Sequence, residues 1–547
     1  MSNKNMNPIF SLKNFRSFGE DGADFELAPI TVLTGCNSAG KSSLVKALML
    51  LSGERRTNYI QNKYKEKLEL SSKQLGLGGY KAVSHGDENI AMSYKIWSPD
   101  LQEELIVKRE FFVKKYDVLN DGALYLITVE KLDGTIIFKA GPGWEDGHLV
   151  YHSPYSDVIT DEFNRFYAVG CYMNMMRLLP IVEKREKEDG IVDSQDKRSV
   201  TALKIVKDRL EAAGVTEKEA ALLWKEYNHE TFKKVINAVS NRLLEKTLIA
   251  NLSVITEIYD DCDLDIMKDE FWDNVVNEVC YPLFNKYLTY IDSASAQISR
   301  LYSVEDDNKM CNALRLLNNR IIDYNDNHDT FYRMDCLVHE PASFLNKWLK
   351  KFGIGDSMEV EGTSEGVGIM AYLHNGNNKR LLADEGYGIT QLASLLLQID
   401  NSIPLYITDS KQYPEFDLGI PAYAYIDYPR HTICVEEPEI HLHPKYQSLL
   451  ADMFVEAYQK YNIHFIIETH SEYLIRKLQV MVADKENKLT ANEVSLNYVE
   501  KNDEGVSHNR QIKIKEDGRL DGSFGTGFFD EAGGLSRQLF MLNDEQS

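Results

Sequence analysis

Two adjacent glutamates and two nearby histidines stand in the segment ICVEEPEIHLHP, residues 433–444. Glu436 and Glu437 follow a short apolar run, and His441 and His443 come next with one residue between them. Carboxylates and imidazoles this close together are typical of sites for metal ions, proton transfer or nucleotides. The other motifs of the chain decide among these three kinds of chemistry.

A glycine-rich loop near the beginning of the chain predicts phosphate binding. The segment GCNSAGKS fits G-x-x-x-x-G-K-[ST] and lies between an expected strand, residues 30–35, and an expected helix. Its backbone N–H groups would surround phosphates at the positive end of that helix, with Lys41 at the β- and γ-phosphates and Ser42 on Mg²⁺. The predicted nucleotide-binding residues of the loop are Gly35, Cys36, Asn37, Ser38, Ala39, Gly40, Lys41, Ser42 and Ser43.

The two glutamates fit the second half of such a site. The run TICVEE predicts a strand that ends at the glutamates. We expect Glu436 to lie near Mg²⁺, which Ser42 would also bind, and Glu437 to face the attacking water as general base. Most P-loop enzymes carry aspartate at the first of these two positions, so Glu436 is a departure from the pattern.

The histidines after the glutamates admit three interpretations. His441 and His443 could bind zinc together with Glu439, could form hydrogen bonds within their loop, or could belong to a loop that faces a second subunit beside the nucleotide. The zinc interpretation is the weakest, because no third distant ligand with suitable spacing stands out. The other two interpretations stay open.

Two further segments complete the set of motifs. EGYGITQ places Gly386, Gly388 and Thr390 before an apolar helix, where backbone N–H groups and a hydroxyl can form an anion site. IIETHSEYL predicts a strand that ends just before His470, which can bind the γ-phosphate or the attacking water through a hydrogen bond. The order of these motifs, with a long gap between Lys41 and the glutamates, is typical of ATP-binding-cassette (ABC) ATPases.

The strand and helix patterns divide the chain into three parts. Strand–helix alternation occupies residues 1–154 and returns in residues 351–547, whereas residues 155–350 contain little glycine and have mainly helical spacing. We therefore predict an α/β fold, an ABC-type P-loop ATPase head assembled from both chain ends. Residues 1–154 would form its N-terminal half, 155–350 a mainly helical insertion domain, and 351–547 its C-terminal half.

Charge and cysteine content exclude several other classes of protein. The net charge is −23, from 61 basic and 84 acidic residues, which argues against an overall electrostatic grip on nucleic acid or an anionic membrane. The seven cysteines are scattered without a C-x-x-C pair, which favours a reduced, cytoplasmic protein. We expect no signal peptide and no membrane span, because the chain has no apolar leader and no long apolar run.

These motifs, in this order, resemble the ABC ATPases of the overcoming-lysogenization-defect and RecF/SMC-like group. The matching segments are LKNFRSF, GCNSAGKSS, DEGYGITQ, VEEPEIHLHP and ETHSEYLI. Within that group the chain is similar to the PtuA-type ATPases of Septu antiphage systems, versions of which also accompany retron reverse transcriptases. The resemblance covers roughly half of the chain and lies at its two ends.

The resemblance implies a head-to-head homodimer that holds two ATP molecules with Mg²⁺ between its subunits. Gly386, Gly388 and Thr390 of one subunit would then contact the nucleotide bound by Lys41 of the other, and Arg16 matches a family arginine near the nucleotide. The resemblance also implies an antiphage complex in which this ATPase controls a separately encoded, PtuB-like HNH endonuclease. A retron reverse transcriptase with its msDNA would be a further partner in some systems.

Two other functions remain as alternatives. A RecF/SMC-like ATPase of DNA repair or chromosome maintenance would share the same motifs. A self-contained nuclease would need a Toprim domain, but the segment after His470 is short for one and contains no D-x-D pair. We therefore expect an ATPase that is not itself a nuclease. The acidic run 259–273 in the expected insertion suits either a basic protein partner or a solvated face.

Overall fold

The computed structural model describes most of the two chain ends and a smaller share of the middle. The described residues are 7–53, 70, 76–86, 89–98, 103–113, 123–134, 136–140, 142–145, 148–151, short pieces between 168 and 184, 198–226, 288–292, 299–303, 308–332, 337–363, 368–407, 431–486, 489–525 and 534–539.

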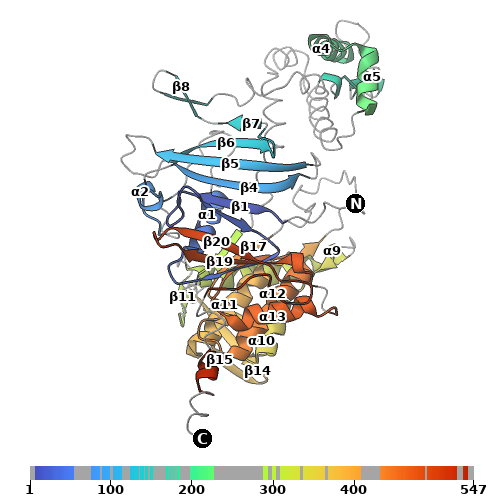
Figure 1. The fold of residues 1–547 in the computed structure, drawn as a ribbon. Coiled ribbons are helices and arrows are strands. Elements are labelled where there is room, and N and C mark those ends of the chain that lie inside the picture. The colour runs from blue at the N-terminus through green and yellow to red at the C-terminus, as the bar shows by residue number, and fades with distance from the viewer. Residues whose placement is uncertain are drawn as a thin grey trace.

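A six-stranded sheet forms the centre of the head (Figure 1). In spatial order its strands are β10 (Leu288–Ile291), β17 (Thr432–Glu436), β18 (His464–Glu468), β3 (Ile30–Gly35), β19 (Val494–Lys501) and β20 (Ser507–Ile512). All neighbouring strands are parallel except β19 and β20. Since β3 pairs with strands from the last part of the chain on both sides, the predicted assembly of the head from both chain ends is confirmed.

Apolar helices form a core with the central sheet. The helices that contribute to this core are α9 (Lys309–Tyr332), α10 (Ser343–Phe352), α11 (Tyr387–Ser402), α12 (Pro444–Tyr461) and α13 (Glu472–Ala483). Strand side chains such as Ile433 and Phe465 pack in the same cluster as Trp348 and Leu396, and all four are fully buried. The parallel strands are apolar on both faces because helices or a second sheet cover them.

A second sheet, which we call the N-terminal sheet, covers α1 (Lys41–Gly53). Its antiparallel strands are β2 (Ala23–Glu26), β1 (Ile9–Lys13), β4 (Ile90–Ser98), β5 (Glu103–Val113), β6 (Ala123–Lys131) and β7 (Ile136–Ala140), in this spatial order. Leu44 and Leu48 of α1 share a core cluster with Phe10 and Tyr94 of this sheet. The helix that follows the glycine-rich loop is therefore fixed between the two sheets.

The remaining described elements lie outside these two sheets and the helices named above. They are α2 (Tyr80–Val83), β8 (Pro142–Glu145), β9 (His148–Tyr151), α4 (Arg198–Ala212), α5 (Glu217–Glu226), β11 (Tyr302–Ser303), β12 (Leu337–Val338), β13 (Ser357–Gly362), β14 (Gly368–Asn375), β15 (Asn378–Leu381), η2 (Leu382–Asp384), β16 (Tyr406–Ile407) and η4 (Ala491–Glu493). Strands β11, β14, β13 and β15 form a small sheet that leads through η2 into α11.

The structure bears on one boundary of the predicted insertion. Strand β10 extends the central sheet through parallel pairing with β17, and helices α9 and α10 contribute to the core beside that sheet. These three elements begin before residue 351, within the range predicted for the insertion, yet they contribute to the sheet or the core of the head. Figure 1 shows α4 and α5 on the far side of the N-terminal sheet from the central sheet. Residues 227–287, which include the acidic run, lie outside the described residues, so the insertion itself stays a prediction.

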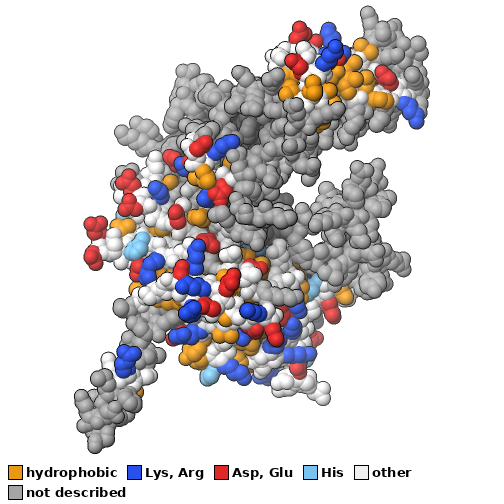
Figure 2. Space-filling view, turned by 45° about the vertical axis from the view of Figure 1, so that its right-hand side comes forward, with side chains coloured by type: hydrophobic (Ala, Val, Ile, Leu, Met, Phe, Trp, Pro, Cys, Tyr) orange, Lys and Arg blue, Asp and Glu red, His pale blue; other side chains and the backbone are white. Residues whose placement is uncertain are grey.

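The described surface mixes charges of both signs. Figure 2 shows Lys and Arg side chains among Asp and Glu side chains over the lower part of the head. The net negative charge of the chain is therefore not gathered on this described face. No helix in the described residues is long and apolar enough to span a membrane.

Candidate functional site

The glycine-rich loop has a shape that requires its two outer glycines. Gly35 has φ +136°, and a Cβ atom there would lie 2.0 Å from the carbonyl oxygen of Val499 on β19. Gly40 has φ +104°, and a Cβ atom there would lie 2.6 Å from the hydroxyl oxygen of Ser17. Any larger residue at either position would displace backbone or strain it. The loop is thus held closely between β19 and the segment after β1.

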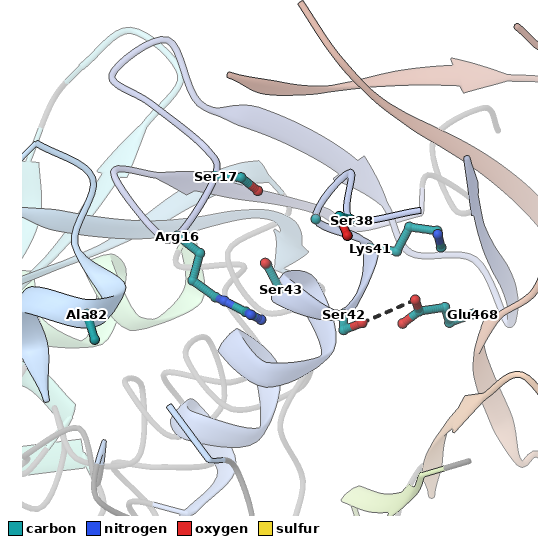
Figure 3. A pocket seen from close by; sticks show the side chains of 9 residues that line it. Arg16, Ser17, Ser38, Lys41, Ser42, Ser43, Ala82 and Glu468 are labelled. Carbon is teal, nitrogen blue, oxygen red and sulfur yellow. Dashed lines mark hydrogen bonds between the residues drawn. The ribbon is translucent and has the colours of Figure 1, made fainter. Parts of the chain in front are cut away.

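A cavity of about 580 Å³ opens beside this loop. Figure 3 shows the Arg16 guanidinium extending toward the start of α1, where Ser42 and Ser43 lie. The lining residues are Arg16, Ser17, Ser38, Gly40, Lys41, Ser42, Ser43, Ala82 and Glu468. The structure therefore places Arg16, which only the family resemblance indicated, in the same cavity as the glycine-rich loop.

The Lys41 side chain lies under the loop. Its Nζ donates hydrogen bonds to the carbonyl oxygens of Gly35, at 3.2 Å, and Cys36, at 3.0 Å, and the residue is only 4% exposed. Burial lowers the pKa of Lys41, while the negative charges of Glu468 and Glu437 oppose this shift. An ammonium group is thus held against the backbone that would surround the phosphates.

Ser42, the next residue, is hydrogen-bonded to a glutamate that the sequence analysis did not select. Its Oγ donates to Oε1 of Glu468 at 3.1 Å (Figure 3). Glu468 is the last residue of β18 and is 6% exposed. Burial raises the pKa of Glu468 to about 7; the Ser42 hydrogen bond opposes this shift, and the charge of Glu436 adds to it. The sequence signal for Glu468 is its position in the motif IIETHS, where it stands two residues before the predicted site residue His470.

Glu436 lies beside Glu468 on the neighbouring strand. The two residues are register partners at the ends of β17 and β18. Burial raises the pKa of Glu436, and a hydrogen bond from Tyr290 on β10 opposes the shift, as does the charge of Lys46. Two carboxylates therefore stand side by side at the carboxyl ends of β17 and β18, the end of the sheet where α1 begins.

Glu437 and His470, the predicted base and its neighbour, come together at the same edge. Oε1 of Glu437 is 4.0 Å from Nε2 of His470, and both side chains are about one-third exposed. The backbone N–H of Glu437 donates to the carbonyl oxygen of Glu468 at 2.7 Å, with φ +45° at Glu437. Burial and the charge of Lys41 lower the pKa of His470, and Glu437 opposes this.

The loop after the glutamates has mainly structural contacts. Oε1 of Glu439, which is 8% exposed, accepts the backbone N–H of His470 at 2.7 Å. Nδ1 of His443 accepts the N–H of Lys445 at 3.3 Å, so His443 caps α12. Among the described residues, no group of three His, Cys, Asp or Glu side chains is arranged to hold a metal ion. The geometry therefore favours the structural interpretation of His443 over zinc binding.

The signature segment at the start of α11 touches this loop from the other side. The rings of Tyr387 and His441 pack edge to face at 4.9 Å, and a Cβ atom on Gly388 would lie 2.6 Å from the His441 carbonyl oxygen. Thr390 is 3% exposed, and its hydroxyl donates to the carbonyl oxygen of Tyr387 at 2.7 Å. The exposed part of this segment is therefore Tyr387 and the flanking Gly386, whereas the Thr390 hydroxyl bonds within its own helix.

The oxygen atoms at the sheet edge fit Mg²⁺. Ser42, Glu436 and Glu468 offer hard oxygen donors, and Oε1 of Glu436 and Oε2 of Glu468 are buried without a hydrogen-bond partner among the described residues. Mg²⁺ usually takes one or two protein carboxylates together with phosphate oxygens and water, so it needs no larger cluster.

Two family models match this sequence. A model of the AAA ATPase domain matches residues 9–475, which is most of the chain. A model of a protein family of unknown function, DUF3696, matches residues 489–539. No curated protein matches the sequence.

Several solved structures of SMC heads are similar to this chain. An SMC head bound to the C-winged helix domain of ScpA is 12% identical, with 92% of this chain and 98% of that chain covered and a TM-score of 0.38. An SMC head from Pyrococcus furiosus, with an extended coiled coil and bound to the C-terminal domain of ScpA, is 11% identical, with 99% and 100% covered and a TM-score of 0.36. An SMC head with a coiled coil and joint from Pyrococcus yayanosii is 12% identical, with 92% and 97% covered and a TM-score of 0.35.

Proposed function

Because the chain belongs to the AAA ATPase domain family, we propose that it binds ATP with Mg²⁺ and hydrolyses it at the edge described above. We call the residues Ser42, Glu436, Glu437, Glu468 and His470 the Walker edge. The observation that carries the proposal is their convergence. Ser42 at the start of α1 meets Glu468, and Glu437 meets His470, although their segments are far apart in the sequence.

Phosphate binding follows from the loop and the helix behind it. The backbone N–H groups of the loop and the positive end of α1 would hold the phosphates, and Lys41 would contribute its charge. Ser42 and Glu436 would hold the cation, which when bound neutralises phosphate charge and orients the γ-phosphate. Arg16, which lines the same cavity, would also reach the nucleotide.

Hydrolysis requires a base that can reach an attacking water. Glu437 is about one-third exposed, so its carboxylate is accessible to a water and can accept a proton from it. His470 stands 4.0 Å from that carboxylate, and its lowered pKa favours the neutral ring near pH 7. A neutral imidazole there can form a hydrogen bond to the water or to the γ-phosphate and hold the reacting groups in line.

The active unit in this proposal is a head-to-head homodimer. Gly386, Tyr387 and Gly388, which we call the signature edge, stand at the positive end of α11. Tyr387 is 48% exposed, so this surface is accessible to a second copy of the chain. A symmetric dimer would bring the signature edge of each subunit to the ATP on the Walker edge of the other.

We further propose that ATP binding and hydrolysis control a separately encoded HNH endonuclease in an antiphage complex. What supports this role is the sequence resemblance to PtuA-type ATPases. The acidic character of the chain suits a basic protein partner better than phosphate-rich nucleic acid. In versions of the system with a retron, the reverse transcriptase and its msDNA would join the complex. The predicted insertion is the part proposed to bind a partner, because nucleotide chemistry does not require it.

Co-purification with the product of a neighbouring HNH reading frame tests this role. We expect the tagged chain to capture that protein, and deletion of residues 227–287 to weaken the capture while ATP hydrolysis continues. Loss of hydrolysis with retained capture would make the segment a structural brace and move the partner surface to the head. A repair or chromosome-maintenance role would gain support if no such reading frame exists.

The purified chain alone should not cut DNA or RNA. Cleavage that depends on a metal ion and disappears in His441→Ala or His443→Ala would contradict this expectation. It would also revive the metal-site interpretation of the histidine loop.

A further inference from the structure

The position of Glu468 in the sheet distinguishes it from Glu436. Strand β18 lies between β3 and β17, so it is β18 that directly neighbours the strand of the glycine-rich loop. Glu468 is the register partner of Leu33 on β3, while Glu436 lies one strand further away. The glutamate that the sequence motif points to is therefore the more distant of the two, in strand order, from β3, the strand that leads into the glycine-rich loop.

The contacts of the two carboxylates also differ. Tyr290 provides a hydrogen bond to Glu436 from the outer side of the sheet. Glu468 instead accepts the Ser42 hydroxyl with Oε1, and its buried Oε2 has no hydrogen-bond partner among the described residues. The nearby Lys41 ammonium donates to loop carbonyls. A buried carboxylate oxygen needs a cation or a donor, because the loss of hydration is otherwise costly.

We propose that Glu468 is a second carboxylate of the Mg²⁺ site, together with Glu436. By accepting a hydrogen bond from the Ser42 hydroxyl, Glu468 directs a lone pair of the Ser42 oxygen toward the cation. Its Oε2 supplies negative charge to the cation or to the water bound to it. This proposal rests on the proposed ATP and Mg²⁺ function and adds a residue that no motif assigns.

A purely structural role for Glu468 makes a different prediction. If the side chain only held Ser42 in place, the amide oxygen of glutamine would accept the same hydroxyl, and cation binding would be unchanged. If the charge serves the cation, glutamine keeps the contact to Ser42 but lowers cation affinity. Glu468→Gln therefore separates the two roles.

The test measures cation and nucleotide binding rather than turnover. Equilibrium binding of a fluorescent ATP analogue is measured with Mg²⁺ and with EDTA, and Mn²⁺ binding to the nucleotide-bound protein is followed by electron paramagnetic resonance. We expect Glu468→Gln to bind the analogue in EDTA as the wild type does, but to lose about 10-fold or more in Mn²⁺ affinity and in the Mg²⁺-dependent gain. Glu436→Gln should show a loss of the same kind.

Two more variants keep the test decisive. Glu439→Gln removes an equally buried carboxylate that bonds the His470 backbone, and it should keep wild-type Mn²⁺ affinity. Glu468→Asp keeps the charge and withdraws it by one methylene, so an intermediate Mn²⁺ affinity is expected even if the glutamine variant folds poorly.

The possible failures are distinguishable. Wild-type Mn²⁺ affinity in both Glu468 variants, with a loss in Glu436→Gln, would overturn the assignment of Glu468 alone. Absence of analogue binding by the wild type would overturn the proposed function and this assignment with it.

Discussion

The Walker edge and the signature edge belong to the same head but differ in how complete they are. On the Walker edge, Glu468 is 6% exposed and Ser42 is bonded to it, and the adjacent Lys41 is 4% exposed. On the signature edge, Tyr387 is 48% exposed. The Walker edge is thus proposed to hold the nucleotide with residues of one chain. The signature edge is a surface whose proposed ligand is held by another copy.

The two edges are in physical contact within each subunit. The loop from Glu437 to His443 begins at the proposed base and packs through His441 against Tyr387 and Gly388. Both Glu437 and His441 have positive φ, at +45° and +59°. Such backbone is held by its surroundings. The loop is therefore a structural element shared by the two edges.

The largest effect is expected at the Walker edge from Lys41→Ala. The variant removes the ammonium group next to the phosphate-binding loop, and we predict that ATP binding is abolished. Isothermal titration with ATP and Mg²⁺ measures this directly. Wild-type affinity in the variant would show that the nucleotide lies elsewhere.

Glu437→Gln should separate binding from chemistry on the same edge. The glutamine cannot accept the proton of the attacking water, so turnover should fall by about 100-fold or more while ATP still binds. The nucleotide-bound dimer should then accumulate and be visible by sedimentation. Turnover within twofold of the wild type would exclude Glu437 as the base. Stronger trapping by Glu436→Gln would mean that the two glutamates exchange roles.

A smaller effect is expected at the signature edge from Gly388→Ala. The added Cβ would lie 2.6 Å from the His441 carbonyl oxygen, so the start of α11 must shift. We predict that ATP binding to the monomer is retained and that dimer-dependent turnover falls by about 10-fold, since small displacements of reacting groups are costly.

Gly386→Ala is the matched comparison for that variant. A Cβ atom at Gly386 meets nothing within 4 Å among the residues that the structure describes, so the monomer should be as stable as the wild type. A loss of dimer-dependent turnover in Gly386→Ala would then report a contact with the second copy. Equal turnover of both alanine variants and the wild type would remove the signature edge from the mechanism.

The smallest effect at neutral pH concerns His339, which lies near the other end of α11, where its backbone N–H donates to the carbonyl oxygen of Leu405. Burial, with the charge of Arg320, lowers the pKa of His339 to about 4, whereas an unfolded histidine titrates near pH 6.5. Between these values the unfolded state binds more protons, so stability should fall as the pH drops from about 6.5 to 4, by at most about 3 kcal/mol for this residue.

Chemical denaturation at pH 7 and pH 5 measures that dependence. His339→Gln should show a smaller loss of stability between the two pH values than the wild type. An identical pH dependence in the variant would mean that His339 titrates alike in both states.

The Walker edge could largely be predicted from the sequence, because its residues are fixed by local rules. The loop from Gly35 to Ser42 is recognisable because its whole motif lies in one short segment of the sequence. The strand before Glu437 is recognisable because it is a continuous apolar run. Glu468 could not be identified as a site residue by such local rules. Its importance comes from the strand order, which inserts β18 between β3 and β17, and single-sequence patterns do not state strand order.

The signature edge was predicted less completely for a similar reason. The glycines before α11 mark the turn, but the direction of the Thr390 side chain depends on how the helix packs. The hydroxyl at the fourth helical residue bonds the Tyr387 carbonyl oxygen and is buried. Its proposed role toward a second nucleotide stays a prediction, whereas the exposed Tyr387 was not selected from the sequence.

The most direct test of the shared site is ATP turnover per chain, measured over a range of chain concentrations with sedimentation velocity on the same samples. Because each Walker edge is proposed to need the signature edge of another copy, we predict that turnover per chain rises with concentration in step with the dimer fraction. Turnover per chain that stays constant where the protein is monomeric would contradict the proposal and make each chain a self-sufficient ATPase.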